Sequence, residues 1–327
     1  MLPHEAFFNK VAYGTAIVHI PVKLLTIMII LCFTPKSMRG LSMFFLNHMA
    51  WNFASNLLFT FFHIYPAFPA ECFRVDGLLG LNTNEDIGHA VFYAEMFCVI
   101  LCGIGITITF PYRYLVFVYP HRRFNPAWIV GSGIVLQICM GSFFGVAYLQ
   151  WIVAYDDYPW QEQLPDRRSL VCFKPSGWGK AITIWTLFIF IVLMILTIIG
   201  FSILLLRSIQ KQRGKMRQKL LDEHRRILWT LILLSSIPVV FGGIPLLLTM
   251  IATFWPHLPY SLEIAAVCIV LTANHGSVYA LALIVAIRPY KRAVRKMLWG
   301  KEKVPKKVGD VRIATLLSAS QINYQNK

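Results

Sequence analysis

The stretch AITIWTLFIFIVLMILTIIGFSILLL (181–206), followed by RSIQKQRGKMRQK (207–219), decides the fold. The first part carries no charged residue and exceeds the ~20 residues that a helix needs to cross the hydrocarbon core of a bilayer. The second part is dense in Lys and Arg, which stay preferentially on the cytoplasmic side of a membrane. Together they predict a transmembrane helix and the side on which that helix ends.

Six further apolar runs of similar length lie before and after this one. The seven runs cover residues 11–33, 42–65, 89–110, 126–149, 181–206, 227–254 and 262–287. Hydrophobic residues make up 57% of the chain and charged residues 14%, a balance that excludes an ordinary soluble domain of this length. The pattern predicts an all-α, polytopic membrane protein built as a bundle of seven transmembrane helices.

The positive charges fall in alternate gaps along the chain. Of the 31 Lys and Arg residues, 24 lie in the gaps 34–41, 111–125 and 207–226 or after residue 287. Because such charges favour the cytoplasmic side, we expect the N-terminus outside and the C-terminus inside. This bias and contact with anionic membrane lipid explain the net charge of +16 without a nucleic-acid partner.

One seven-helix domain is expected over residues 1–299. The first run lacks the basic start and the cleavage site of a signal peptide, so we interpret it as the first transmembrane helix. After the seventh run, Tyr290, Val294, Met297 and Leu298 recur at helical spacing between cationic residues. This pattern predicts a short interfacial helix over about 290–299, followed by a polar, disordered tail over 300–327.

Two of the seven cysteines fall in gaps that we expect outside. Cys72 lies between the second and third runs, and Cys172 lies between the fourth and fifth. An oxidising exterior permits a disulfide between them, and the alternative is two unpaired loop thiols. The other five cysteines lie within apolar runs, where a thiol behaves as a small apolar group.

The second run carries a narrow polar stripe. His48, Asn52, Asn56 and His63 fall within about 80° of arc on a helix, so they are expected to face other helices rather than lipid. Two interpretations stay open, namely hydrogen bonds between helices or a wet polar channel that rearranges on activation. Lys23, in the first run, is expected to find an acceptor on the second or seventh helix.

Glu95 is the one carboxylate that lies well inside a predicted span. It is placed about two turns from the outer end of the third helix, with Cys98 and Cys102 on the same face. A ligand amine or a neighbouring donor could pair with Glu95, or the group could stay neutral. We therefore single out Glu95, Cys98 and Cys102 as candidate ligand contacts.

The sixth and seventh runs contain residues that weaken a helix. They are Pro238, Gly242, Gly243 and Pro245 in the sixth run, and Asn274, His275 and Gly276 in the seventh. Proline removes a backbone hydrogen bond and glycine adds freedom, so we expect bends at both places. Such bends either act as a conformational switch that lets the inner ends of two helices swing, or are static packing kinks.

The sequence contains none of the motifs of common enzyme chemistry. It has no Walker loop and no His-Glu-x-x-His, Gly-x-Ser-x-Gly or Cys-x-x-Cys pattern, and its histidines lack metal-ligand spacing. The seventh run has no lysine that could hold retinal. The sequence therefore predicts no enzyme activity, no metal site and no cofactor.

Four short motifs are spread along the chain. They are Thr34-Pro35-Lys36-Ser37-Met38 with Asn47-His48 and Trp51, then Phe110-Pro111-Tyr112-Arg113-Tyr114, His275-Gly276 and Pro289-Tyr290-Lys291. The set resembles the nematode seven-transmembrane chemoreceptors, in particular serpentine receptor class H. Pro111 and Tyr112 depart from the family pattern, which has an acidic and an amide residue before the arginine. Lys291 also departs from it, because it lacks the planar fork of the usual arginine.

The resemblance implies a G-protein-coupled receptor in the plasma membrane of sensory cilia. A small external chemical would be its ligand, and a heterotrimeric G protein its inner partner. Expected contacts with that G protein are Arg113, Arg213, Lys215, Arg217, Lys219, Arg225, Arg288 and Lys291. A seven-helix ligand-gated channel or transporter is the alternative, and a dimer is compatible with the sequence.

Overall fold

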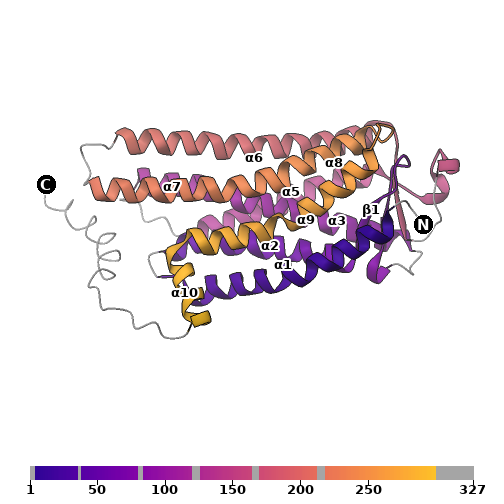
Figure 1. Cartoon of the computed structure of the whole chain (residues 1–327). Coiled ribbons are helices and arrows are strands. Elements are labelled where there is room, and N and C mark those ends of the chain that lie inside the picture. Colours follow the sequence, from indigo (N-terminus) through magenta and orange to yellow (C-terminus); the bar gives the residue numbers. More distant parts are fainter. Residues whose placement is uncertain are drawn as a thin grey trace.

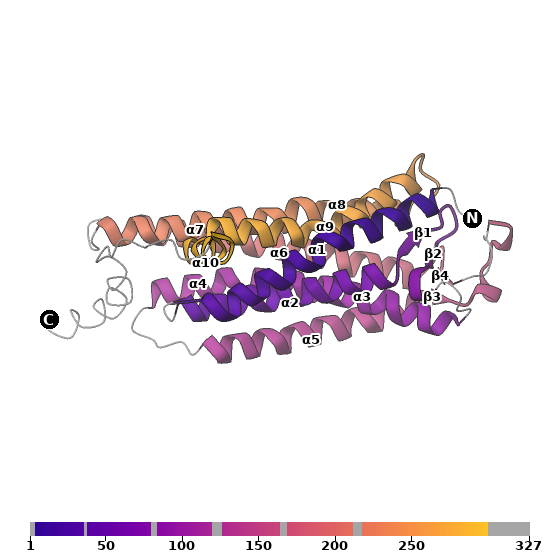
Figure 2. The same ribbon diagram turned by 60° about the horizontal axis from the view of Figure 1, so that its bottom comes forward.

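The computed structural model describes residues 4–35, 38–79, 84–119, 126–163, 169–211 and 218–299. Its long helices run side by side along one axis, and a small β-sheet lies across one end of the bundle (Figure 1). Helix α1 begins at this end, which we call the sheet end. Helix α10 lies at the opposite end, which we call the tail end (Figures 1 and 2).

The helices reproduce the predicted seven-span bundle. Their bounds are α1 Glu5–Phe33, α2 Arg39–Phe61, α3 Glu85–Thr107, α4 Thr109–Val118, α5 Pro126–Trp151, α6 Trp178–Lys211, α7 Gln218–Pro238, α8 Ile244–Phe254, α9 Ser261–Ala286 and α10 Arg288–Trp299. Helices α3 and α4 follow one another as one span, and α7 continues into α8 through a π-helical turn. The prediction of an all-α, seven-helix membrane fold is confirmed for the bulk of the chain.

Six of these spans are long and apolar enough to cross a membrane, judged over the described residues. Helix α2 runs in the bundle with these six spans and completes the set of seven. Its polar side chains, among them His48, Asn52 and Asn56, lower its mean hydropathy. Large apolar side chains such as Ile17, Trp185 and Leu196 are exposed on the outward faces of α1 and α6. Such surfaces are stable only in contact with lipid, as in a multi-pass membrane protein.

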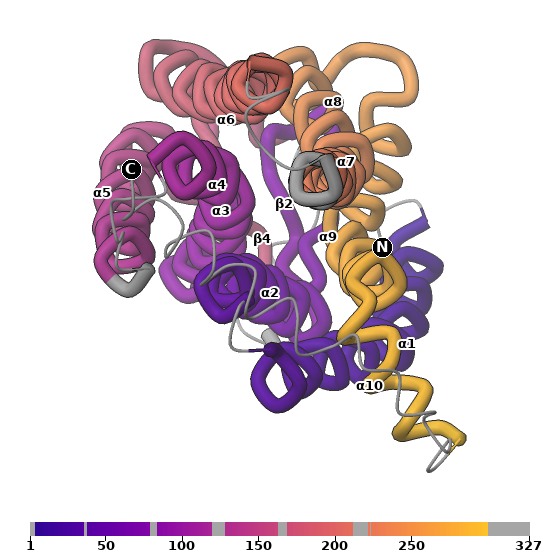
Figure 3. The backbone as a smooth tube through the Cα atoms, turned by 90° about the vertical axis from the view of Figure 1, so that its left-hand side faces the viewer, coloured from indigo at the N-terminus to yellow at the C-terminus, as the bar shows by residue number. Residues whose placement is uncertain are grey.

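The helices pack as a ring with two apolar clusters inside it. Helix α9 packs against α1, α2 and α8, and α3 packs along α2, as the view down the bundle shows (Figure 3). One cluster lies toward the sheet end and includes Phe92, Tyr148 and Trp151. The other lies toward the tail end and includes Tyr279 and Tyr290.

A four-stranded antiparallel sheet, which we did not predict, is made from two separate loops. Its strands, in spatial order, are β1 Ile64–Pro66, β2 Cys72–Val75, β4 Leu170–Phe173 and β3 Ile152–Val153. Cys72 lies opposite Cys172 in the pairing of β2 with β4, and the two form a disulfide. In Figure 3, β2 and β4 lie across the far end of the bundle.

The end of the second span was predicted too far along the chain. Helix α2 ends at Phe61, and residues 64–66 pair with 73–75 instead of continuing the helix to residue 65. Pro66 does not continue a helix, whereas Ile64 and Tyr65 have side chains that suit a strand. Gly77, with a φ of 75°, then brings the chain back against the carbonyl of Phe61.

The third span is longer than the predicted run 89–110. Asn84 caps its start, because its Oδ1 accepts hydrogen bonds from the backbone nitrogens of Asp86 and Ile87. Helix α4 then carries the span on to Val118, so that Arg113 lies within helical structure.

Candidate functional site

A cavity of about 90 Å³ lies inside the bundle beside the sheet. Its wall takes residues from α2, α3, α5, α6, α8 and α9 and from strands β1 and β2. The lining residues are Phe59, Ile64, Phe73, Phe92, Glu95, Met96, Val99, Phe144, Trp151, Thr183, Ile184, Leu187, Leu246, Thr249, Met250, Thr253, Ile269, Thr272 and Ala273. Most of them are apolar, so the cavity suits a small organic molecule better than a string of waters.

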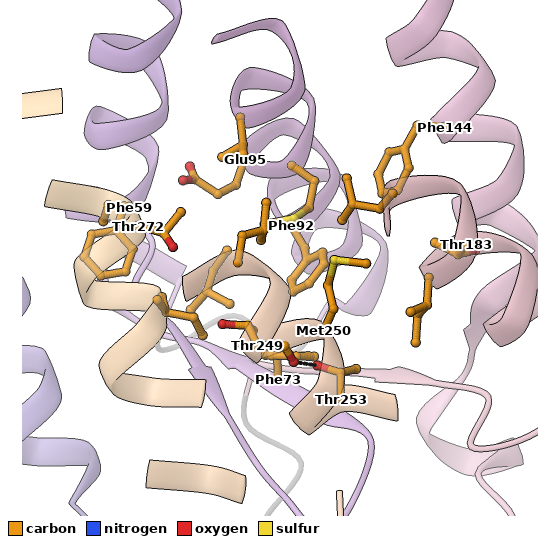
Figure 4. A pocket seen from close by; sticks show the side chains of 18 of the residues that line it. Phe59, Phe73, Phe92, Glu95, Phe144, Thr183, Thr249, Met250, Thr253 and Thr272 are labelled. Atoms are coloured by element: carbon orange, nitrogen blue, oxygen red, sulfur yellow. Dashed lines mark hydrogen bonds between the residues drawn. The ribbon is translucent and has the colours of Figure 1, made fainter. Parts of the chain in front are cut away.

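Glu95 supplies the carboxyl group of this wall. The residue is only 6% exposed, and its Oε1 accepts a hydrogen bond from Ser55 Oγ of α2 at 2.6 Å. Its Oε2 is buried without a hydrogen-bond partner among the described residues. Figure 4 shows Glu95 at one side of the cavity, across from Thr249 and Thr253. A buried oxygen with no partner costs free energy, so it marks a place where a guest molecule could bind.

Four threonines complete the polar part of the lining, and each hydroxyl donates to a helix backbone. Thr249 Oγ1 donates to Pro245 O at 3.0 Å, and Thr253 Oγ1 donates to Thr249 O at 2.8 Å. Thr183 Oγ1 is within reach of Ala147 O and Gly179 O, and Thr272 Oγ1 of Gly242 O. These hydroxyls therefore face the cavity chiefly as acceptors.

The polar stripe of α2 connects three helices below the cavity. Lys23 Nζ of α1 is fully buried and lies 3.4 Å from Asn52 O, the acceptor on the second helix that we expected. Asn52 Nδ2 lies 3.1 Å from His275 Nε2 of α9, and His275 Nδ1 lies 2.5 Å from Thr272 O. Because Thr272 also lines the cavity, this network reaches its wall.

The remaining members of the stripe are also buried. His48 Nδ1 lies 3.0 Å from Cys102 O and 3.3 Å from Cys102 Sγ, and Asn56 Nδ2 donates to Ala273 O. His63 lies beyond the end of α2, where its ring packs 4.3 Å from the ring of Tyr13 between centroids. His48, Asn52 and Asn56 thus contact other helices directly, but each also has a buried polar atom without a hydrogen-bond partner among the described residues, as do both ring nitrogens of His63. Both interpretations of the stripe therefore stay open.

The cysteines that we grouped with Glu95 lie elsewhere. Cys98 and Cys102 are buried, but neither is among the residues that line the cavity. Cys102 contacts His48 on the α2 side of α3 instead. The cavity is lined by Phe92, Glu95, Met96 and Val99 of α3, so Glu95 lies at the border of the cavity-facing side and the two cysteines lie beyond that border.

The two predicted bends have different outcomes. Pro238 is followed by the π-helical turn Val239–Gly243, labelled η5, and Pro245 lies in the first turn of α8. A π-helical turn inserts a residue into the helix and loosens its hydrogen bonding, as expected for the sixth span. Helix α9 runs without interruption from Ser261 to Ala286, so the bend at Asn274 and Gly276 stays a prediction.

Local contacts hold the polar and glycine residues of α9 in place. Asn274 Nδ2 donates back to Val270 O at 2.9 Å, one turn earlier in the same helix. Gly276 lies so close to α2 that a Cβ atom there would meet Asn52 Oδ1 at 1.6 Å. The polar and glycine residues of the seventh span therefore serve close packing against α2. Gly242 of η5 lies against the other side of His275, with its Cβ position 3.3 Å from the ring.

A buried ion pair fastens the loop between β1 and β2 to the helices. Lys180 Nζ of α6 lies 2.5 Å from Glu71 Oε1 and also donates to Pro175 O and Phe254 O. The Glu71 nitrogen donates to the hydroxyl oxygen of Tyr158 at 2.9 Å. Burial raises the pKa of Glu71 to about 7, although the Lys180 ammonium acts in the opposite direction.

At the tail end, Arg113 links the third and sixth spans. Its Nη2 lies 3.1 Å from His224 Nδ1 of α7, and the His224 ring packs against Phe117. Helix α10 is amphipathic, since Tyr290 and Ala293 are buried while Lys291 is exposed. Arg225 of α7 and Arg288, the first residue of α10, are also exposed at this end.

Several predicted residues cannot be placed. Arg213, Lys215 and Arg217 lie outside the described residues, as does the tail 300–327, and only the backbone of Lys219 is described, within α7. Sequence reasoning also missed partners that the structure supplies. Ser55, Gln137 and Thr272 each lie within an apolar run, where an isolated polar residue could have drawn attention.

A comparison with protein-family models now places the chain. Residues 3–300 match the model described as "Serpentine type 7TM GPCR chemoreceptor Srh". The chain belongs to the Srh chemoreceptor family. The match covers nearly all of the described structure, so both the cavity and the tail-end surface lie within the family's own domain.

The fold agrees with this assignment. The structure of this Srh chain resembles the crystal structure of squid rhodopsin, with a TM-score of 0.66 and 11% sequence identity. The similarity covers 93% of this chain and 88% of the rhodopsin chain. At this identity the likeness shows a common seven-helix fold and nothing further. No curated protein matches the Srh chain.

Proposed function

We propose that this chemoreceptor binds a small external molecule in the cavity beside the sheet and activates a heterotrimeric G protein at the tail end. The observation that carries the proposal is Glu95 Oε2, a buried and unpartnered acceptor in an otherwise apolar wall. Ligand cavities in proteins are mostly apolar and contain a few placed polar groups, which agrees with this wall.

The proposed orientation puts the sheet end outside the cell. The strong bias of Lys and Arg toward the gaps at the other end supports it, since 24 of the 31 residues fall there. The disulfide in the sheet supports it as well, because disulfides persist in oxidising surroundings. A plasma-membrane location in sensory cilia follows from the family and is part of the same proposal.

Signal transmission would follow the contacts between α9 and the π-helical turn. Thr272 lines the cavity, contacts Gly242 O at 3.4 Å and offers its backbone oxygen to His275. A ligand that shifts α8 or α9 would therefore act on η5, where helix geometry is already loosened. The inner half of the sixth span, α7, would then move relative to Arg113.

Coupling would use the cationic surface at the tail end. Arg113, Arg225, Arg288 and Lys291 lie there, and the predicted contacts Arg213, Lys215 and Arg217 are outside the described residues. Exposed cations attract an acidic partner surface and raise the rate of encounter. Arg113 differs from the others, because its guanidinium already contacts His224 and would have to exchange that partner on activation.

The test is a ligand screen in cells that reads calcium or cyclic nucleotide with and without a matching G protein. We expect responses that require the G protein. Met250→Trp, which fills the cavity from α8, should abolish them, whereas Leu248→Trp on the exposed face of the same helix should not. An Arg113→Ala receptor that reaches the surface and signals normally would contradict the coupling assignment. A membrane current that the ligand evokes in cells without the G protein would favour the alternative, a ligand-gated channel.

A further inference from the structure

Phe73 is a cavity-lining residue that comes from the sheet. It belongs to β2, which lies between β1 and β4, and it pairs with Pro66 on one side and Val171 on the other. Its side chain is only 3% exposed, and Figure 4 shows it where the strands pass the cavity, across from Glu95. Phe73 therefore forms part of the wall that closes the cavity toward the sheet end.

Three residues next to Phe73 in the chain are each tied to a different element. One tie is the disulfide of the sheet, and the other two are ion pairs, with N···O distances of 2.5 and 3.3 Å, between side chains at most 8% exposed. The pairs are Cys72 with Cys172 of β4, Glu71 with Lys180 of α6, and Arg74 with Glu5 of α1. Moving this strand would break a covalent bond or leave buried polar groups without partners, so β2 holds Phe73 in place.

The ring of Phe73 is also confined by its neighbours. The centroids of the Phe68, Phe92 and Phe173 rings lie between 5.0 and 5.9 Å from its own. Met96 and Met250, which line the cavity from helices, have unbranched and flexible side chains that adapt to a guest. The wall therefore yields at the methionines before it yields at Phe73.

The cavity that Phe73 closes is small and mostly apolar. Its volume is about 90 Å³, less than the ~150 Å³ of an engineered apolar cavity that stays dry and binds benzene. A guest of about six non-hydrogen atoms, the size of 1-pentanol, is therefore near the upper limit. Protein interiors are close-packed, so a longer guest fits only if part of the wall gives way.

We propose that Phe73 determines the size of the ligand. The cavity takes mainly hydrocarbon molecules of up to about six non-hydrogen atoms, and the fixed ring of Phe73 excludes longer members of the same chemical series. This inference rests on the proposed function, because it assumes that the cavity is the ligand site. It holds for either protonation state of Glu95, since it compares molecules that share one polar group.

The experiment measures binding across a homologous series, the 1-alkanols from 1-propanol to 1-octanol. Their hydroxyl donates as well as accepts, so it can pair with Glu95 Oε2 whether or not that carboxyl group carries a proton. Each alcohol is titrated into the full-length receptor in lipid nanodiscs, and the readout is the thermal unfolding temperature, which needs no G protein. The same titration of Met250→Trp, whose cavity is filled, gives the effect of each alcohol on the bilayer and is subtracted.

The unsubstituted receptor should show a length limit. We expect the free alcohol concentration at half-maximal stabilisation to fall about fourfold for each added methylene up to about 1-pentanol. Beyond that length the concentration should rise, to about tenfold above the 1-pentanol value at 1-octanol. A concentration that continues to fall through 1-octanol would overturn the proposed size limit.

A matched set of variants assigns the limit to Phe73. Phe73→Ala should extend it by about two methylene groups, toward 1-heptanol, and the milder Phe73→Leu by about one. Phe45→Ala removes a buried ring of equal size from the tail-end cluster, outside the cavity, and should leave the limit at 1-pentanol. If Phe73→Ala fails to fold, the shift in Phe73→Leu decides the proposal.

The outcomes separate this inference from the proposed function. A limit that does not move in the Phe73 variants, or that moves equally in Phe45→Ala, would overturn the role of Phe73 and leave the cavity as a ligand site. If no alcohol stabilises the receptor more than it stabilises Met250→Trp, both the proposed ligand site and this inference are overturned.

Discussion

Gly276 is a residue whose small size can be tested directly. A Cβ atom there would lie 1.6 Å from Asn52 Oδ1 and 2.2 Å from its Cγ, so Gly276→Ala should displace the Asn52 side chain and its contact with His275. We expect a loss of about 1–3 kcal/mol in the free energy of unfolding, measured by thermal denaturation. Gly200→Ala, which meets no atom within 4 Å in α6, should be neutral or slightly stabilising. Equal effects would contradict the packing role of Gly276.

Glu71 makes stability depend on pH. Burial raises its pKa from an ordinary value of 4.5 to about 7, so between these values the folded state keeps a proton that the unfolded chain has lost. The contribution of Glu71 is therefore largest below about pH 4.5 and is lost as the pH rises toward about 7. Thermal unfolding at about pH 5 and pH 8 should show this decrease, and Glu71→Gln should remove it. An identical decrease in both proteins would assign the dependence to other groups.

Single residues of the interior were partly predictable from the sequence. The polar stripe of α2 and the isolated Lys23 and Glu95 stood out because polar groups are rare in apolar runs. Two of their partners did not, because the backbone oxygens of Asn52 and Cys102 leave no mark in a sequence. Ser55, the partner of Glu95, was visible as a polar residue in an apolar run but was overlooked. Cys98 and Cys102 were grouped with Glu95 by helical spacing, but the side of α3 that lines the cavity carries Met96 and Val99 instead, and the sequence does not show which side of Glu95 faces a cavity.

At the scale of elements, the π-helical turn η5 invites a paired substitution. Gly242 faces the His275 ring, with its Cβ position 3.3 Å from Cγ, whereas the Cβ position of the next glycine, Gly243, meets only Pro238 O at 3.8 Å. Gly242→Val should push on His275 and lower the free energy of unfolding by about 1–3 kcal/mol, together with the cellular response. Gly243→Val should have a smaller effect on both. A larger loss of stability and response in Gly243→Val than in Gly242→Val would show that the contact between η5 and α9 contributes to neither.

The sheet offers a second test at this scale. The Cys72–Cys172 disulfide closes a loop of 100 residues and joins β2 to β4. The double variant Cys72→Ala with Cys172→Ala should lose about 2–5 kcal/mol of stability, measured by thermal unfolding in lipid. The corresponding double substitution of Cys32 and Cys139, which are free and exposed, serves as the control. Equal losses in the two proteins would show that the bridge contributes little.

Elements with a strong internal signal were predicted well, and those that need a distant partner were not. Each long helix satisfies its backbone within itself, so an apolar run is enough to reveal it. Strands β1 and β2 have only three and four residues. They pair with one another, and β2 also pairs with β4, which lies almost 100 residues further along the chain. The packing role of Gly276 was missed for a related reason, because it depends on the close approach of α2 rather than on α9 itself.

At the scale of the whole molecule, the orientation is open to a simple measurement. In the sequence, 24 of the 31 Lys and Arg residues fall in one alternate set of gaps, and the described members Arg113 and Arg288 lie at the tail end. This bias predicts that the tail end faces the cytoplasm. A tag at the N-terminus should be stained on intact cells, and a tag at the C-terminus only after permeabilisation. The reverse pattern would overturn both the orientation and the proposed direction of signalling.

The whole-molecule fold followed from composition and spacing, but the cavity did not. Seven apolar runs of membrane length are compatible with only a few folds, and the motifs that resemble the chemoreceptor family reduced the number of candidate folds further. The cavity depends on how side chains from six helices and two strands fill the space between them. The sequence analysis singled out Glu95, but not Phe59 of α2, the two lining residues of α5 or the two of the sheet.

The sheet has a consequence for how such receptors diversify. Ile64 of β1 and Phe73 of β2 line the cavity, although both belong to a loop rather than to a helix. A substitution at either position changes the shape of the cavity without altering a residue of any helix. A gene family could therefore vary this cavity through a short loop while its helices keep their sequence.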